Sequence, residues 1–157
     1  MNKLVFTVLE TNEDIAVYGL RQKSNDKTQL KDIPSLLKKY YAVVKKGPGE
    51  VIPFFVISKD YNESTRDFSL FIGGLLENQN LETFTIPSGL FVKTTIKPKT
   101  GLLWGWLIGK TKRAFYTDWL PKSNYTALNM EYEYHTEASL GKNPQIDILF
   151  AVKEATK

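Results

Sequence analysis

The sequence contains no cysteine and a single histidine, His135, among its 157 residues. Without cysteine the chain can form neither disulfides nor thiolate nucleophiles, and cysteine-based zinc sites are excluded. One histidine also excludes a multi-histidine metal site. We therefore expect no metal and no cofactor, and we interpret His135 as a surface or hydrogen-bonded side chain rather than as a haem or metal ligand.

Long apolar runs and a strong charge of one sign are also missing. The run LLWGWLI at residues 102–108 is far shorter than a membrane-spanning segment. The first residues, MNKLVFTVLETNED, do not form a signal peptide, because the apolar stretch is short and acids follow at once. The net charge is only +4, and its lysines and arginines are spread along the chain. We expect a cytoplasmic protein without direct contact to membrane or nucleic acid.

What remains is an ordinary globular composition, with 42% hydrophobic and 24% charged residues, which excludes a disordered chain. Its length is sufficient for a buried core, so we predict one domain over residues 1–157. Apolar and β-branched runs between turn residues predict strands at 4–9, 15–20, 53–58, 68–72, 81–86, 90–96, 130–136 and 145–152. Within the second of these, Gly19 predicts a bulge or a close backbone approach.

Two helices are predicted between these strands. The first begins near Asp32 as its cap, with Pro34 in the first turn, and ends before the GPG sequence at 47–49. The second covers about residues 102–120 and carries all three tryptophans of the chain, Trp104, Trp106 and Trp119. Since it is apolar on two faces, we predict that it forms one wall of an apolar cavity.

The order of elements repeats in the two halves of the chain, about 1–80 and 81–157. Each half is predicted to run strand, helix, two-stranded hairpin. The sequence therefore predicts an α+β fold of two strand-helix-strand-strand repeats. These repeats would form an antiparallel sheet of about eight strands with two main helices, and a ligand cleft between the halves.

Four segments carry a resemblance to a known family: 86–90 (IPSGL), 116–125 (YTDWLPKSNY), 132–134 (YEY) and 146–152 (IDILFAV). Together they resemble the GyrI-like small-molecule-binding domain, which is also the effector-binding domain of some bacterial AraC- and MerR-type regulators. The resemblance covers about residues 84–153, and the first half matches by layout alone. It implies that hydrophobic, often cationic, drug-like molecules bind in a cleft between the two units.

The resemblance also implies ligand-binding residues. A glutamate in the last strand of the family commonly contacts the ligand, and the matching position here is Asp147, one methylene shorter. The glutamate of the preceding strand matches Glu133. By strand alternation, Asp147 points away from the face that carries Ile148 and Phe150. It is therefore either a plain exposed acid or an acid at the floor of the cleft.

The strand around Glu133 leaves two interpretations open. Glu131, Glu133 and His135 share one face, and Tyr132 and Tyr134 share the other. In the first interpretation, the face with the glutamates is a polar outer surface and the tyrosines form an inner face. In the second, Tyr132 and Tyr134 line the ligand cleft. By layout, Ser69 is the first-half counterpart of Asp147 and would lie across the seam. The complete candidate set is Asp147, Glu133, Tyr132, Tyr134, Trp104, Trp106, Phe55, Phe71, Ser69 and Tyr116.

These expectations favour a stand-alone binding module for a hydrophobic or cationic small molecule, acting in drug sequestration or in sensing through a regulatory protein partner. Aromatic rings near a carboxylate suit such ligands, although the same rings also serve as core. We predict no catalytic residues, because no nucleophile, base and orienting group occur together. The alternatives are a hydrolase of reactive lipophilic compounds that uses Tyr134 with Glu133 or Asp147, a modulator of DNA gyrase, and a haem-binding protein of the SOUL type.

Overall fold

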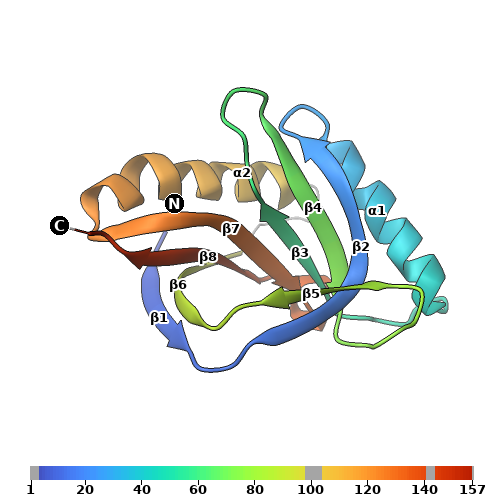
Figure 1. The fold of residues 1–157 in the computed structure, drawn as a ribbon. Helices are drawn as coiled ribbons and strands as arrows, with labels where there is room; N and C mark the ends of the chain where they lie inside the picture. Colours follow the sequence, from blue (N-terminus) through green and yellow to red (C-terminus); the bar gives the residue numbers. More distant parts are fainter. Residues whose placement is uncertain (1–3, 98–103, 141–143, 157) are drawn as a thin grey trace.

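The computed structural model describes residues 4–97, 104–140 and 144–156, apart from the side chains of residues 104, 138 and 140. Its main element is a curved antiparallel sheet with two helices on one face (Figure 1). The strands are β1 Thr7–Thr11, β2 Ile15–Asn25, β3 Phe54–Lys59, β4 Asp67–Gly74, β5 Glu82–Ile86, β6 Gly89–Ile96, β7 Tyr125–His135 and β8 Ile146–Glu154. The helices are α1 Gln29–Val44 and α2 Trp104–Ala114, and the short elements are η2 Phe115–Trp119, η3 Leu120–Lys122 and α3 Glu137–Leu140.

The order of strands in the sheet confirms the predicted repeat. The order is β1-β6-β8-β7-β3-β4-β2-β5, so strands at equal distance from the two ends are corresponding strands of the two halves. The halves meet at β3 and β7, which are hydrogen-bonded with Phe55 opposite Tyr134. Because the rings of these two residues stack at 4.2 Å between centroids, the centre of the seam is occupied by side chains.

Two long ribbons bring the ends of the sheet together. β1 pairs with β6 up to Thr11 opposite Gly89, and β2 pairs with β5 from Ile15 opposite Ile86. Between the paired stretches, the backbone N–H of Ser88 donates to the Asp14 carboxylate at 2.7 Å. The sheet therefore curls into a half-barrel with a concave inner face and a convex outer face (Figure 1).

Gly19 is a point of close backbone approach, as predicted. It lies opposite Gly73 in the β2–β4 pair. A Cβ atom at Gly19 would lie 2.1 Å from the carbonyl oxygen of Ile72, and a Cβ at Gly73 would lie 2.2 Å from that of Tyr18. Only glycine fits at both positions, because the backbones of the two paired strands approach too closely there for a Cβ atom.

Three apolar clusters form the core. The inner face of the sheet buries one of them: Val17, Phe55, Ile57, Phe71, Ile86, Phe91, Met130, Tyr132 and Ala151. On the outer face, α1 covers a cluster that includes Leu36, Tyr40, Phe54, Val56, Leu70 and Ile72. The segment from α2 to η3 covers Val92, Ile96, Phe115, Ile146, Ile148, Phe150 and Val152 on the same face. Ile148 and Phe150 thus face the helices, as alternation predicts.

Both helices differ from their predicted bounds. α1 begins three residues before Asp32, whose carboxylate accepts hydrogen bonds from the side chains of Ser24 and Thr28 at 2.8 and 2.7 Å. It ends before Lys45, which has a left-handed φ of 57°. The predicted second helix divides into α2, a π-helical turn and a 3-10 turn. Residues 102–103 of that prediction lie outside the described residues.

β2 and β7 extend furthest beyond their predicted bounds, because the sequence signal covers only their apolar parts. β2 continues to Asn25 through polar residues that pair with β4. β7 begins at Tyr125, and a register shift separates its first residues from Glu131. The short helix α3 was not predicted.

Candidate functional site

The two faces of the sheet separate the predicted ligand-binding residues. Strand alternation places Asp147, Tyr132, Tyr134, Phe55, Phe71 and Ser69 on the inner face. Glu133 and Tyr116 lie on the outer face, below the helices, since Glu133 is opposite Ile148 in the β7–β8 pair. The candidate set is therefore divided between the two faces of the sheet, and Glu133 and Asp147 lie on opposite faces.

Neither of the two tryptophan side chains that the structure describes lines a cavity on the inner face. Trp106 is 63% exposed, and the Lys110 ammonium lies 5.0 Å from its ring centroid. Trp119 packs in the outer-face cluster, stacked on Phe115 at 5.6 Å. Trp104 begins α2, and its side chain lies outside the described part of the chain. The predicted cavity wall is thus a helix that covers the outer face.

On the inner face, the aromatic residues of the candidate set serve as core. Tyr132 lies between Phe55 and Phe91, with ring centroids 5.8 and 5.9 Å away. Phe71 packs against Phe84 at 5.5 Å. Burial, and then the nearby charge of Asp147, raise the pKa of Tyr132 to about 12. The phenol therefore stays neutral at ordinary pH, inside a filled aromatic layer.

Asp147 lies at the edge of this layer and already has polar partners. Its carboxylate accepts a hydrogen bond from the Thr95 hydroxyl at 2.5 Å and lies 3.8 Å from the Lys93 ammonium. The side chain is 40% exposed. Asp147 is therefore neither an unpaired surface acid nor the floor of a dry cleft, but a partly exposed acid with a lysine beside it.

Two hollows open near the inner face. The first has a volume of about 500 Å³ and lies next to Asp147, lined by Val5, Thr7, Leu9, Lys93, Thr95, Lys97 and Gln145. The second has a volume of about 460 Å³ and is lined by Arg21, Lys23, Asp60, Asn62, Thr65, Asp67, Phe68 and Ser69. Ser69 thus belongs to a different hollow from the one beside Asp147.

The register shows how far apart these two counterparts lie. Asp147 is in line across the sheet with Tyr134, Phe55 and Gly73. Ser69 is four residues from Gly73 along β4, which is about 13 Å at the rise of a strand. Since β7 and β3 also separate the two strands, Ser69 and Asp147 cannot contact one small ligand together.

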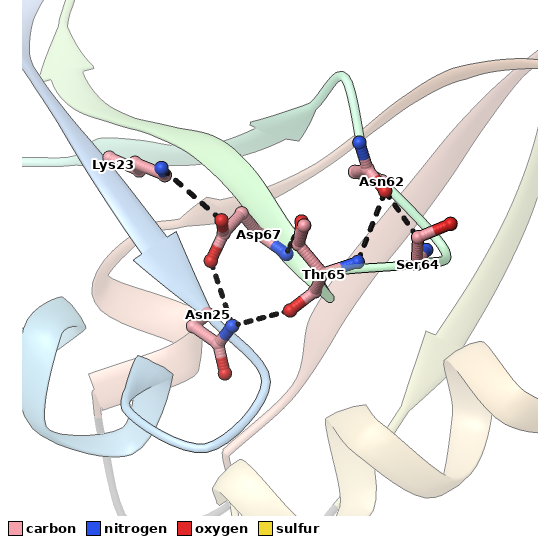
Figure 2. Close-up of polar contacts among 6 residues, drawn as sticks. All are labelled: Lys23, Asn25, Asn62, Ser64, Thr65 and Asp67. Carbon is pink, nitrogen blue, oxygen red and sulfur yellow. Dashed lines mark hydrogen bonds and ion pairs between the residues drawn. The ribbon is translucent and has the colours of Figure 1, made fainter.

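The second hollow borders a polar turn region, and Figure 2 shows the polar contacts among six residues of that region. The Asn62 side-chain oxygen accepts from the backbone N–H groups of Ser64 and Thr65, at 2.9 and 3.1 Å. Asn25 donates to the Asp67 carboxylate at 2.8 Å, and Lys23 lies 3.2 Å from the same carboxylate. These contacts hold the β3–β4 hairpin against β2, so the polar groups here are used by the fold itself.

The outer face contains a buried charge cluster that the sequence did not predict. Glu133 is only 3% exposed, and its carboxylate lies 3.2 Å from the Lys112 ammonium. The same ammonium lies 3.4 Å from Glu131, which accepts a hydrogen bond from the Tyr116 hydroxyl. His135 lies 3.6 Å from Glu133. The interpretation of Glu131, Glu133 and His135 as a polar outer surface is wrong, because Lys112 of α2 and Tyr116 of η2 lie against the two glutamates and His135 stacks on Phe54 at 4.7 Å.

The cluster remains charged despite its burial. Burial acts to lower the pKa of Lys112, but the charges of Glu133 and Glu131 outweigh it and raise that pKa. Burial acts to raise the pKa of Glu133, but the charge of Lys112 and the contacts with His135 and Lys112 together outweigh burial and lower this pKa. Burial and the Glu131 charge both raise the pKa of Tyr116. The arrangement is an ammonium between two carboxylates, with a neutral phenol donating to one of them.

Local structure explains how these side chains meet. Phe115 is fully buried and stacks on Phe150 of β8 at 3.9 Å, which fixes the start of the π-helical turn on the sheet. Lys112 and Tyr116, on either side of it, are thereby directed at β7. A lysine in the last turn of a helix is normally solvated, so nothing in the sequence indicated that Lys112 belongs among the candidate site residues.

Comparisons with known proteins identify the fold. No family model and no curated protein matches the sequence. Among solved structures, an integron cassette protein from Vibrio cholerae is 17% identical with a TM-score of 0.65, over 97% of this chain and 100% of that one. SAV2435, solved bound to tetraphenylphosphonium, is 10% identical with a TM-score of 0.67, over 97% and 94% of the two chains. The EcmrR C-terminal domain is 14% identical with a TM-score of 0.53, over 98% of both.

Two further findings concern the described residues alone. They contain no cluster of acidic and histidine side chains that could hold a metal ion. None of their helices is long and apolar enough to cross a membrane.

The sheet order, the two covering helices and the solved neighbours together show that this chain has the fold of the GyrI-like effector-binding domain, as the segments around residues 86–90 and 116–125 predict.

Proposed function

We propose that this protein binds a hydrophobic small molecule, with lipophilic cations among its ligands, as an effector sensor or a sequestering protein. The observation that carries the proposal is the acid pair Glu131 and Glu133, which lies buried on the outer face and already accommodates an ammonium group. The neighbour SAV2435, which shares the fold, was solved with the lipophilic cation tetraphenylphosphonium.

The surroundings of the acid pair suit such a ligand. Tyr116 lies edge-on to Phe115 and Phe150, at 4.9 and 5.7 Å between centroids, and its hydroxyl group reaches Glu131. Aromatic faces attract a cation by about 0.5–2 kcal/mol each, and a buried carboxylate needs a positive partner. A molecule with a cationic centre and apolar substituents would satisfy both requirements.

Asp147 is the second acid that a ligand could use. The hollow beside it, of about 500 Å³, falls within the usual range for small-molecule sites, and Val5 and Leu9 supply apolar lining. Lys93 competes for the Asp147 carboxylate, and Lys97 adds positive charge. This hollow therefore favours a neutral or polar part of a ligand over a cationic one.

We place this role in a stand-alone cytoplasmic protein that acts by sequestration or through a regulatory protein partner. The two main helices, α1 and α2, both cover the sheet, so neither is presented as a separate DNA-reading element. Small-molecule capture needs no such element, because binding alone lowers the free concentration of the ligand.

Thermal unfolding with and without ligand tests the proposal. We would use tetraphenylphosphonium, rhodamine 6G and the neutral triphenylphosphine oxide. A ligand at 100 times its dissociation constant stabilises the native state by about 2.7 kcal/mol. Glu133→Gln should weaken the response to the two cations, Asp147→Asn should have a smaller effect on them, and the exposed Asp118→Asn serves as the matched control.

The absence of any shift with all three compounds, for the wild type and the variants, would contradict the proposed function. A response that Asp147→Asn abolishes and Glu133→Gln leaves unchanged would move the site to the inner face.

A further inference from the structure

Each of the two candidate acids already has a lysine from the same chain as its partner. Lys93 lies beside Asp147, and Lys112 lies between Glu131 and Glu133. We infer that Lys112 is an intramolecular competitor that occupies the cation position of the acid pair, so that it sets the charge selectivity of the ligand site. This inference rests on the proposed function and goes beyond it, because it names the residue that limits the binding of cations.

The charges of the cluster give the first argument. Glu131 and Glu133 contribute two negative charges and Lys112 one positive charge, which leaves one negative charge when His135 is neutral. The Lys112 ammonium can donate three hydrogen bonds, whereas tetraphenylphosphonium can donate none. A bulky cation can therefore contact the carboxylates of Glu131 and Glu133 only if the Lys112 ammonium moves away from them.

The origin of the groups gives the second argument. Both acids come from β7 at the centre of the sheet, between β8 and β3, and Lys112 comes from the last turn of α2. A tethered group acts as a competitor at a high effective concentration, of the order of millimolar for short flexible tethers. Removal of the lysine should thus strengthen cation binding without any new contact.

The construction of α2 gives the third argument. This helix of 11 residues contains Gly105 and Gly109, and each glycine costs a helix about 1 kcal/mol relative to alanine. A Cβ atom at Gly109 would meet nothing within 4 Å, so packing does not require glycine there. The helix then passes into the π-helical turn η2, a feature often found at functional sites. Moving Lys112 with α2 therefore costs less than moving β7.

A set of charge-matched variants tests the inference by isothermal titration with tetraphenylphosphonium and triphenylphosphine oxide. Lys112→Gln/Glu131→Gln keeps the net charge of the cluster at its wild-type value and leaves Glu133 without the lysine. We expect its dissociation constant for tetraphenylphosphonium to fall at least tenfold. Adding Glu133→Gln should abolish that gain, and the neutral phosphine oxide should bind all proteins within about twofold.

Lys110→Gln is the matched control, since Lys110 is on the same helix but lies over the exposed Trp106 ring. A gain with this control as large as that of the double variant would overturn the inference, because it would reflect the overall charge. So would a gain that survives Glu133→Gln, because it would reflect a loosened helix. If no variant binds either compound, both the proposed function and the inference fail. If all variants bind as the wild type does, the inference is overturned and the proposed function stands.

A second measurement needs no substitution. In the wild-type protein, saturating tetraphenylphosphonium should increase the reactivity of Lys112 toward acetic anhydride, detected by mass spectrometry, because the displaced ammonium becomes exposed. Triphenylphosphine oxide should not change it, and Lys110 reports the unaffected background. Unchanged Lys112 reactivity with the cation bound would overturn the inference even if the double variant does not fold.

Discussion

Replacing Lys112 by methionine would keep most of the length of the side chain and remove its ammonium group. Glu131 and Glu133 would then lie buried together without the charge that offsets both of them. Lys93→Met is the matched control, because it removes the same group from the pair with Asp147, whose side chains are 41% and 40% exposed. The Lys112 side chain is only 19% exposed.

The two replacements should differ severalfold in their effect. Removing one partner of a buried ion pair costs about 3–5 kcal/mol, because the remaining charge stays desolvated. An exposed pair contributes about 0–1 kcal/mol. With an m value of about 2 kcal/mol per molar of urea, the unfolding midpoint should fall by about 2 M for Lys112→Met and by at most about 0.5 M for Lys93→Met.

Urea unfolding followed by tryptophan fluorescence measures this, since Trp119 packs against the buried Phe115 next to the cluster. The double variant Lys112→Met/Glu133→Gln should be more stable than the sum of its single effects, because it removes both charges together. If Lys112→Met costs no more than Lys93→Met, or if the double variant is additive, the ion pair does not stabilise the fold in the way that we infer.

Three other predictions follow from particular contacts. Gly73→Ala should destabilise the protein strongly, because its Cβ would lie 2.2 Å from a carbonyl oxygen, while Gly109→Ala in α2 should raise the free energy of unfolding by about 1 kcal/mol in thermal melts. The phenolate absorbance of Tyr132 should appear near pH 12 rather than at its usual 10.0, and Asp147→Asn should lower that pKa. The pKa of Glu133 lies below its usual 4.5, so its contribution to stability is present above pH 4.5 and is lost as the pH falls through the folded-state pKa. Glu133→Gln should therefore flatten the loss of stability in acid, and an unchanged acid profile would count against the ion pair.

Much of the fold follows from the sequence, because local patterns carry it. Every predicted strand corresponds to a strand of the sheet, since apolar alternation and turn residues are local signals. Gly19 predicted a bulge or a close backbone approach, because few positions inside a strand require glycine, and the structure shows the close approach opposite Gly73. The two-fold repeat of the halves was visible in the order of elements and is present in the sheet.

The candidate site followed less well. The sequence singled out Asp147 and Glu133 as candidate ligand-binding acids, and strand alternation correctly placed Asp147 on the face opposite Phe150. That rule could not say which face is open, and the inner face proved to be filled by its own aromatic residues. Ser69 was matched to Asp147 by layout, yet the register places it four residues away from the row of Asp147.

The sequence by itself determined the strands, the two main helices and their antiparallel α+β arrangement, because side-chain periodicity along the chain specifies them. The tertiary structure alone decided which charges meet. Lys112 and Glu133 are 21 positions apart in the sequence, on a helix and a strand whose relative placement depends on the stacking of Phe115 on Phe150. Such a pair has no signature in the order of residues, since a lysine on a helix is identical in sequence whether it faces water or a buried acid.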